Sequence, residues 1–314
     1  MLRFIITRTA MAIPTLLIVA VTVFILIRMV PGDPAALMLG DNADAESVAR
    51  LQARLGLDQP LPVQFAVWFR HLLTGDLGQS ITTGQEVLPL VWKRFLVSAQ
   101  IVVVAVFLAC LIAVPAGAIA AWRQNGRLDV SLVSLATLLM SIPTFWLGLL
   151  LLLFLGLKQQ WLPVVGYVSI ADDPWRGILY LVMPILTMFL HELGVLLRMA
   201  RASTLEVKNL EYISHARAKG LAESTVLWRH AFKNSFGPTW TLIGLVLGNL
   251  LGGIAVVETV FTIPGIGRLL VDAIFGRDYP VIQGCMLMIA AIYVVVNLVV
   301  DLCYPLFDPR VAVE

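Results

Sequence analysis

The chain has 314 residues, of which 59% are hydrophobic and only 13% are charged. Soluble domains contain about a quarter of charged residues and about half apolar residues, so this composition indicates a membrane protein. The net charge is +2, and the chain has no run of Lys or Arg and no basic patch interleaved with aromatic residues. These features exclude nucleic acid as a partner.

The N-terminus begins like a secretory signal, because Arg3 and Arg8 precede an apolar run. The run continues to Val30 without a small-residue cleavage site, so an uncleaved first span is favoured. Spanning a bilayer takes about 20 mostly apolar residues. Six such stretches occur, at residues 10–30, 95–122, 131–157, 178–197, 239–261 and 281–306. The prediction is an all-α, polytopic membrane protein with six transmembrane helices, since no alternating pattern suggests a barrel.

The distribution of Lys and Arg predicts the orientation, because short cytoplasmic segments are enriched in them. With the N-terminus inside, the inward segments (1–9, 123–130, 198–238 and 307–314) hold twelve Lys and Arg in 66 residues. The outward segments (31–94, 158–177 and 262–280) hold nine in 103 residues. An N-in, C-in topology follows. Its parts are an N-terminal end with the first span (1–30), an outer helical region (31–94), a core of five spans (95–306) and a cytoplasmic tail (307–314).

The outer region 31–94 shows the pattern of short amphipathic helices. Asp44 is placed to cap a helix that ends at Gly56 and whose apolar residues are Val48, Leu51 and Leu55. A second helix is predicted after Pro60 and Pro62, with one apolar face formed by Phe65, Trp68, Phe69, Leu72 and Leu73. Such a helix lies at the membrane interface or covers the outer end of the bundle. A packing role and a functional role are equally supported.

The inward loop 198–238 is long and contains charges of both signs. A first helix is predicted over residues 205–219, ending at Gly220. Ser224 is placed to cap a second helix, and Pro238 to mark the start of the fifth span. The apolar residues of the second helix are Val226, Leu227, Ala231 and Phe232. A helix–glycine–helix unit at the cytoplasmic face has the shape of a docking element, and a solvated loop is the alternative.

The chain lacks motifs for nucleotide binding and for metal catalysis. No G-x-x-x-x-G-K-[ST] sequence occurs, so there is no P-loop. His191 and Glu192 begin the zinc motif H-E-x-x-H, but Val195 occupies the second ligand position. No catalytic, cofactor or metal residues are therefore expected. The cysteines lie far apart in apolar stretches and are expected to be buried thiols; they are Cys110, Cys285 and Cys303.

Ionisable residues inside spans are costly, so each raises a question of function. Glu258 lies near the end of a span, where it could border water. His191 and Glu192 lie deeper, in the fourth span, and are expected to face protein or a pathway. Structural pairing or pore lining is favoured over a proton relay, which would need a connected series of such groups.

Eight stretches, in chain order, resemble one protein family. Glu211-Tyr212-Ile213-Ser214-His215-Ala216-Arg217-Ala218-Lys219-Gly220 and residues 228–234 resemble the EAA loop of ATP-binding-cassette importer permeases in its peptide-importer form. The other matching stretches are residues 31–35, 55–60, 75–80, 142–148, 258–261 together with 264–267, 277–280 and 308–310. Together they cover essentially the whole chain, which is similar to the B-type permeases of dipeptide, oligopeptide and nickel importers. Two features depart from the general EAA pattern: its Glu-Ala pair is Ser214-His215 here, and its later proline is displaced to Pro238.

The resemblance implies the type I ABC importer permease fold in a bacterial inner membrane. In this family a homologous second permease completes a heterodimeric pathway, two ATPases bind ATP beneath it, and a periplasmic binding protein delivers substrate. This chain would then be no enzyme and would need no cofactor. The resemblance places ATPase coupling in loop 198–238, at Glu211, Tyr212, His215, Ala216, Arg217, Ala218, Lys219 and Gly220.

Roles for these residues follow from the same resemblance. Gly220 would turn the chain between helices, because φ > 0 costs glycine little. Ala216 and Ala218 would permit close approach of the ATPase, and Arg217 and Lys219 would pair with its acidic groups. Candidates for the pathway or gate are His191, Glu192, Glu258, Pro264 and Gly265. The segments 31–94 and 264–280 are candidates for outer gating or contact with the binding protein.

Three other classes compete with this interpretation. A secondary transporter would show inverted repeats or paired broken helices; no clear repeat occurs, although Pro143 and Pro184 could break the third and fourth spans. A membrane enzyme lacks its catalytic groups, and a channel lacks a carbonyl filter or charged ring. The substrate remains open among dipeptides, longer peptides, nickel and glutathione, and no Cys/His cluster favours a metal.

Overall fold

The computed structural model describes residues 2–29, 39, 44–56 and 58–306. Within these residues four helices are long and apolar enough to cross a membrane. They are α1 (Leu2–Met29), α5 (Val87–Trp122), α8 (Pro174–Lys208) and α14 (Tyr279–Cys303). Helix α5 begins within the predicted outer region 31–94, so the helix that contains the predicted second span starts earlier than that span.

The break considered at Pro143, within the predicted span at 131–157, is confirmed, because the chain bends there by 94°. Helix α6 (Arg127–Ser141) ends at Ile142, whose backbone is extended, and α7 (Thr144–Leu151) starts after Pro143. A residue before proline is disfavoured in the helical region, which explains the break. A π-helix, η1 (Leu152–Lys158), continues α7. The break considered at Pro184 does not occur, since Pro184 lies inside the continuous helix α8.

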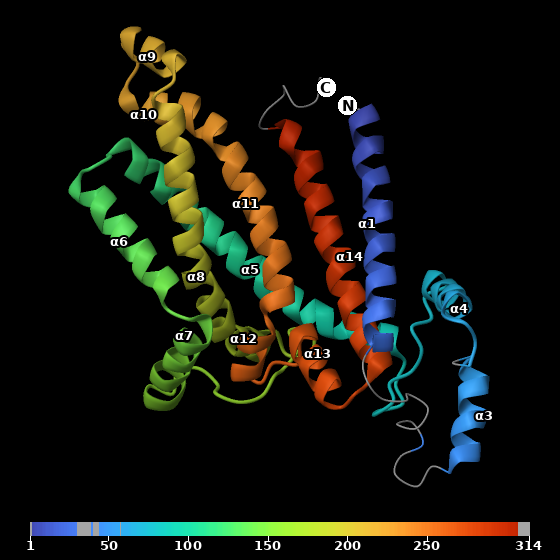
Figure 1. The fold of residues 1–314 in the computed structure, drawn as a ribbon. Helices are drawn as coiled ribbons and strands as arrows, with labels where there is room; N and C mark the ends of the chain where they lie inside the picture. Colours follow the sequence, from blue (N-terminus) through green and yellow to red (C-terminus); the bar gives the residue numbers. More distant parts are fainter. Residues whose placement is uncertain (1, 30–38, 40–43, 57, 307–314) are drawn as a thin grey trace.

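Helix α11 (Phe232–Gly253) is the remaining long helix in the described part of the chain. Its 22 residues extend about 33 Å, but glycine, threonine and asparagine lower its hydropathy, and it is not among the four helices that are both long and apolar enough to cross a membrane. It starts before Pro238, which therefore lies inside the helix and does not mark its beginning. Figure 1 shows α11 running alongside α8 and α14. The count of six spans and the N-in, C-in orientation stay predictions.

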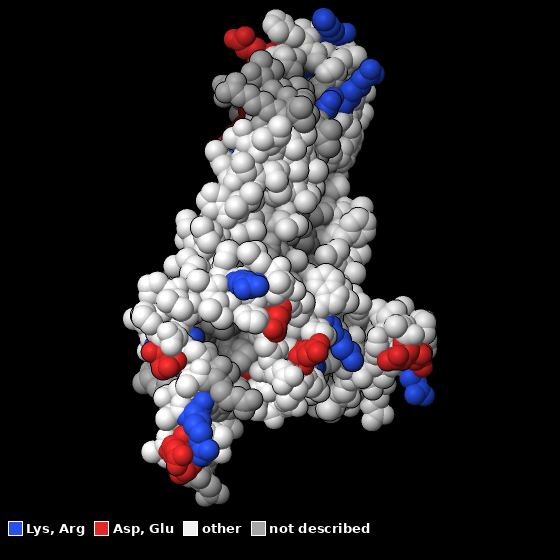
Figure 2. Space-filling model, turned by 90° about the vertical axis from the view of Figure 1, so that its right-hand side faces the viewer, with Lys and Arg blue, Asp and Glu red and all other residues white. Residues whose placement is uncertain are grey.

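The segments that were predicted to share a side of the membrane lie at the same end of the bundle. Figure 1 shows that α1 begins and α14 ends at the same end of the bundle as α9 (Glu211–Ala218), which we call the α9 end. The α13 end contains α3 (Ala45–Leu55), α4 (Leu61–Leu73), α12 (Ala255–Val260) and α13 (Ile266–Phe275). On the face in Figure 2, charged side chains gather toward these two ends and a broad uncharged band separates them.

The two short helices predicted in the outer region are confirmed. Asp44 caps α3 by accepting a hydrogen bond from the Ser47 backbone N–H at 3.2 Å, and Gly56 ends it with a φ of 66°. Aromatic residues of α4 pack on α1, where the ring centroids of Phe65 and Trp68 lie 5.3 and 5.4 Å from that of Phe24. The motifs at residues 31–35 and 308–310 and the tail 307–314 lie outside the described residues.

The centre of the bundle is a close pair formed by α5 and α8. A Cβ atom built on Gly117 of α5 would lie 2.5 Å from the carbonyl oxygen of Leu197 on α8. Only glycine permits this approach of two backbones, which is a common device of membrane helix pairs. The buried face of α5 is otherwise rich in small residues, including Ala105, Ala109 and Ala113.

Candidate functional site

The predicted helix over residues 205–219 is wrong, because two helices share this segment. Helix α8 ends at Lys208, and α9 begins after Leu210, whose extended backbone interrupts the helical path. The predicted turn at Gly220 is confirmed by its φ of 77°. The next elements are α10 (Glu223–Thr225) and the π-helix η2 (Val226–Ala231), with Ala222 and not Ser224 at the N-cap.

One face of α9 is buried against its own chain. Ile213 and Ala216 belong to a small apolar core, separate from the main one, with Ala118, Val207, Val226, Leu227 and Ala231. This core joins α9 to the ends of α5 and α8 and to η2. Ala216 is only 6% exposed, so its side chain packs within this chain, and its role in ATPase coupling stays a prediction.

The opposite face of α9 is open. Its exposed predicted residues are Glu211, Tyr212, His215, Ala218, Lys219 and Gly220. Large apolar side chains are exposed beside them at this charged end, at Leu210, Leu221 and Trp228. An exposed apolar group rimmed by polar residues is typical of a surface that contacts another protein.

Arg217 has its acidic partner within this chain. Its Nε donates to Glu223 Oε1 at 2.9 Å, and its guanidinium lies 4.9 Å from the centre of the Trp122 ring. Lys208 Nζ donates to the Trp122 carbonyl at 3.2 Å. We call these four residues the Trp122 cluster. The hydrogen bond from Arg217 lowers the pKa of Glu223 below its ordinary value, so this carboxyl is ionised at neutral pH.

A buried ion pair holds the turn between α5 and α6 against α8. Arg201 on α8 donates to the two carboxylate oxygens of Asp129 on α6 at 2.6 and 2.8 Å. Asp129 also accepts from the backbone N–H of Asn125 at 2.9 Å. Sequence reasoning missed this pair, because both residues resemble ordinary charges at the edge of a cytoplasmic loop.

Glu258 and Gly265 lie together at the α13 end, and Pro264 precedes Gly265 in the chain. Their role in a pathway or gate stays a prediction. Glu258 is fully buried, which contradicts the expectation that it borders water. Its carboxylate accepts from the Ser98 hydroxyl and, at 2.8 Å, from the Arg268 backbone N–H in the first turn of α13. Any side chain at Gly265 would overlap this carboxylate. We call Glu258, Ser98, Gly265 and the first turn of α13 the Glu258 cluster.

A second buried carboxylate at this end was not predicted. Asp278 caps α14 and is only 2% exposed. It accepts from the hydroxyls of Ser80 and Thr82 and from the backbone N–H groups of Ile81 and Thr82. Burial opposes its ionisation, but these hydrogen bonds prevail and lower its pKa. This Asp278 cluster joins two stretches, 75–80 and 277–280, that sequence reasoning treated only as family signatures.

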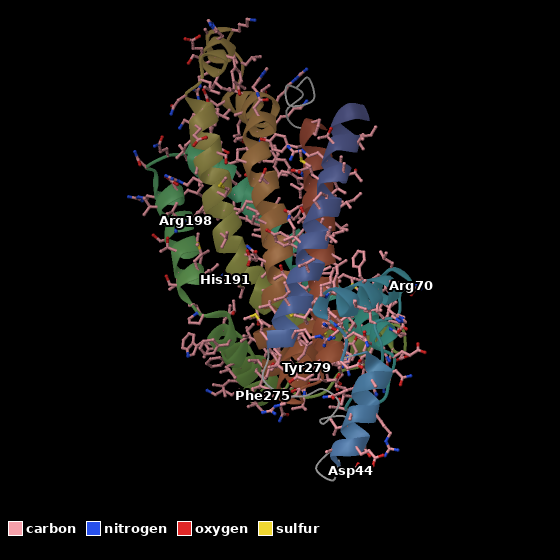
Figure 3. The ribbon with its side chains drawn as sticks, turned by 45° about the vertical axis from the view of Figure 1, so that its right-hand side comes forward. Asp44, Arg70, His191, Arg198, Phe275 and Tyr279 are labelled. Atoms are coloured by element: carbon pink, nitrogen blue, oxygen red, sulfur yellow. The ribbon has the colours of Figure 1, made fainter. Side chains whose placement is uncertain are left out.

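His191 and Glu192 do not join these clusters. Figure 3 shows His191 midway along α8, away from Tyr279 and Phe275 at the α13 end. Glu192 is 5% exposed, and the buried Nδ1 of His191 has no hydrogen-bond partner among the described residues. An apolar groove of about 440 Å³ between α5 and α8 is lined by residues that include Gln100, Leu181 and Phe189, and by neither candidate.

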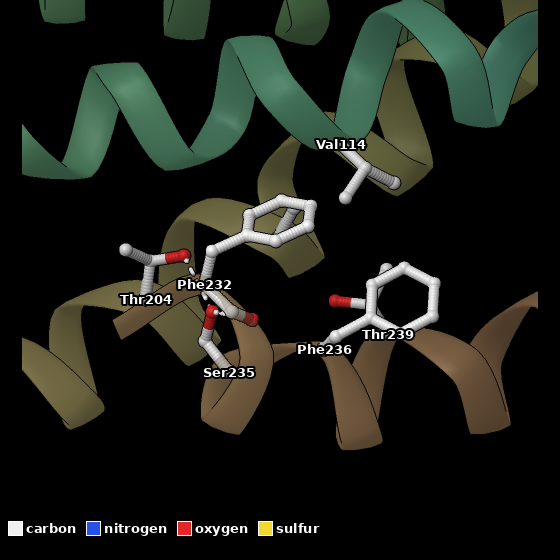
Figure 4. A pocket seen from close by; sticks show the side chains of 7 residues that line it. Val114, Thr204, Phe232, Ser235, Phe236 and Thr239 are labelled. Atoms are coloured by element: carbon white, nitrogen blue, oxygen red, sulfur yellow. Dashed lines mark hydrogen bonds between the residues drawn. The ribbon is translucent and has the colours of Figure 1, made fainter. Parts of the chain in front are cut away.

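Three hydroxyl residues line a small void where α8 and α11 meet near the α9 end (Figure 4). Thr204 Oγ1 donates to Ser235 Oγ at 3.2 Å, joining the two helices. The buried Thr239 Oγ1 has no partner within the described part of the chain. Val114 of α5 closes the void from the other side.

Comparison with known proteins identifies the family. Residues 113–313 match the family described as the inner membrane component of binding-protein-dependent transport systems, and residues 1–106 match the N-terminal region of such membrane components. A probable peptide ABC transporter permease, y4tP of Sinorhizobium fredii, is 40% identical over 98% of each chain. The dipeptide permease DppB of Alkalihalophilus pseudofirmus is 36% identical, and the glutathione permease GsiC of Salmonella choleraesuis 40% identical, over 99% of each chain.

The two family matches together span almost the whole chain, and the relatives align from end to end. The helices long enough to cross a membrane lie in the matched regions, apart from residues 107–112 of α5, which fall between the two matches. This protein belongs to the inner-membrane permease family of binding-protein-dependent transport systems and is a multi-pass permease subunit of an ABC importer.

Proposed function

We propose that the chain forms half of a translocation pathway for dipeptides or other short peptides. A homologous second permease would supply the other half, two ATPases the energy, and a periplasmic binding protein the substrate. The support is the similarity over nearly the full length to permeases whose names specify peptides and dipeptides.

We further propose that the exposed face of α9 is the ATPase docking surface and that the α9 end is cytoplasmic. The observation that favours this is the two-sided construction of α9, with Ile213 and Ala216 anchored in a core and Tyr212 and Lys219 exposed. When a partner displaces a helix that is packed on the bundle, the bundle is displaced with it, whereas a solvated loop would change its own conformation instead. The cytoplasmic assignment also agrees with the excess of Lys and Arg.

Reconstitution tests the transport function. The complete complex in proteoliposomes should take up a labelled dipeptide when ATP is inside and the binding protein outside. Uptake that needs no ATP and collapses with the proton gradient would instead indicate a secondary transporter.

A pair of matched variants tests the docking surface. Gly220 and Gly56 each end a short helix with positive φ, and each donates its N–H to a carbonyl three residues earlier. Proline has a φ near −65° and no N–H, so Gly220→Pro and Gly56→Pro cause the same local damage at opposite ends. Gly220→Pro should lower the amount of ATPase that copurifies with the permeases, and Gly56→Pro should not. Equal retention in both variants would contradict docking at α9.

Glutathione is a second candidate substrate, because the glutathione permease is as similar to this chain as the peptide permease is. Competition distinguishes the two. Excess unlabelled glutathione should leave dipeptide uptake unchanged if peptides are the substrate, and should abolish it if glutathione is preferred.

A further inference from the structure

Helix α5 takes part in clusters at both ends of the molecule. Trp122, its last residue, belongs to the Trp122 cluster beside α9, and Ser98 belongs to the Glu258 cluster beside α13. A helix rises about 1.5 Å per residue, so these two positions are about 36 Å apart. Helix α5 is thus one continuous element that contacts both α9, the proposed docking helix, and the Glu258 cluster, which contains the gate candidates Glu258 and Gly265.

At the α9 end, side chains connect α9 to α5. The backbone joins α9 to α8 and α10, and not to α5. Trp122 lies under the Arg217 guanidinium, and Arg217 is held in place by Glu223. Lys208 donates to the carbonyls of Ala121 and Trp122, which the end of α5 would otherwise leave without partners.

At the α13 end, one buried hydroxyl connects α5 to Glu258 and to α13. Ser98 is fully buried; it donates to Glu258 and accepts from the backbone N–H of Ile266 at 2.9 Å. Ile266 is the first residue of α13. A displacement of α5 would have to move the first turn of α13 or break two buried hydrogen bonds, which are costly to lose.

Between its two ends α5 is held to α8. Gly117 approaches the backbone of Leu197, and Arg201 on α8 pairs with Asp129 just beyond the end of α5. The helix continues through Pro115 without interruption. These contacts favour movement of α5 and α8 as one body over sliding of one along the other.

We propose that α5 transmits motion from α9 to α13, with Trp122 and Ser98 as the positioning residues at its two ends. This inference rests on the proposed docking of the ATPase at α9. ATP-driven displacement of α9 reaches Trp122 through Arg217, moves α5 along with α8, and shifts α13 through Ser98 and Glu258. The outer end of the pathway therefore responds to the nucleotide state through side-chain contacts of α5.

A reporter on α13 tests this in the assembled complex. Phe275, the last residue of α13, is 85% exposed and lies at the α13 end in Figure 3. Phe275→Cys, in a chain whose three native cysteines are replaced by alanine, accepts a fluorescent label. The label should respond to ATP. Trp122→Leu should reduce that response about 2- to 30-fold, the range seen for changes within coupling networks, while Trp122→Phe should restore most of it.

The matched control removes a different ring from beneath a cation. Lys158 Nζ lies 4.9 Å from the centre of the Phe154 ring, the same distance as Arg217 from Trp122. Phe154→Leu should leave the response of the label intact. The amount of copurified ATPase should be equal in all variants, because a loss of assembly would reduce every signal.

Two results would overturn the inference. One is an ATP response in Trp122→Leu equal to that of the unmodified chain. The other is a label that never responds to ATP although the complex takes up peptide; that outcome leaves the proposed function standing and refutes only the transmission to α13. Absence of uptake with normal ATPase retention would instead refute the proposed substrate.

Discussion

The two ends of the molecule hold their acidic residues in different ways. At the α13 end, Glu258 and Asp278 are buried and are satisfied by hydroxyls and backbone N–H groups. At the α9 end, Glu223 pairs with Arg217 and Asp129 with Arg201. The side chain of Glu223 is 58% exposed, and that of Asp129 only 4%.

The buried contacts at the α13 end have a fixed geometry, whereas the exposed Arg217–Glu223 pair at the α9 end can rearrange. We call the α13 end the fixed end and the α9 end the adjustable end. Hydrogen bonds to backbone N–H groups have fixed geometry and leave costly unsatisfied donors when the acceptor is removed. Partly exposed ion pairs are weak and can exchange partners with little change in free energy. The exposed Arg217–Glu223 pair at the α9 end is therefore a contact expected where another protein binds and moves, whereas the buried Asp129–Arg201 pair is not. The α13 end has the contacts of a body displaced as a unit.

The largest effect is expected when the Asp278 cluster is broken. Asp278→Ala leaves several donors at Ser80, Ile81 and Thr82 without an acceptor, and each costs about 1–3 kcal/mol. The free energy of unfolding in detergent should fall by more than about 3 kcal/mol. Asp173→Ala is the control, because Asp173 also caps a helix but at an exposed position, and it should cost about 1 kcal/mol. Equal losses would contradict the argument that burial makes the contacts of Asp278 costly to lose.

The next effect concerns the buried pair at the α9 end. Asp129→Asn leaves Arg201 without its charged partner; since the Arg201 side chain is 24% exposed, the loss should be about 1–3 kcal/mol, below that of a fully buried pair. Asp272→Asn removes a 68% exposed partner of Arg268 and should cost at most about 1 kcal/mol. Thermal unfolding of the purified complexes measures both. A larger loss for Asp272→Asn would contradict the burial argument.

Acid stability provides a third test. Because the pKa of Asp278 is lower in the folded protein, this group stabilises the fold above its ordinary pKa of about 3.9. That contribution is lost as the pH falls through the folded pKa, below about pH 4. The wild-type chain should therefore lose stability more steeply below about pH 4 than Asp278→Asn. Parallel curves would show that Asp278 does not titrate with folding.

The smallest effect on stability is expected at Arg217. Arg217→Gln should change the free energy of unfolding by less than about 1 kcal/mol, because the pair with Glu223 is exposed. The difference in free energy of unfolding between Arg217→Gln and the wild-type chain should shrink as the salt concentration rises from about 0.1 M to about 1 M, because the Debye length falls from about 10 Å to about 3 Å. A loss as large as that of Asp278→Ala would mean that the α9 end is not the adjustable one.

Local patterns predicted the ends of some helices well and others poorly. Asp44 and Gly56 fulfil their predicted roles because a cap depends only on residues within one turn. The break at Leu210 has no such signal, since neither glycine nor proline stands there. The position of Leu210 between two packed helices, and not its own preference, interrupts the path.

Candidate site residues that are close together in the sequence were also recognised, and those that are far apart were missed. The exposed residues of α9 were recognised as a group because they are contiguous in sequence. Asp278 and Ser80 were missed as partners because almost two hundred positions separate them. Glu258 was recognised as unusual, but its burial depends on Ser98, far away in the chain.

The sequence by itself determined the membrane class, most of the apolar helices and the family, because composition and short motifs do not depend on distant contacts. Tertiary structure alone decided which charges are satisfied by backbone and which by ion pairs. It also decided that Arg217 faces Trp122 and that one face of α9 is buried. These outcomes depend on residues brought together from different helices, and no local pattern encodes the distances between them.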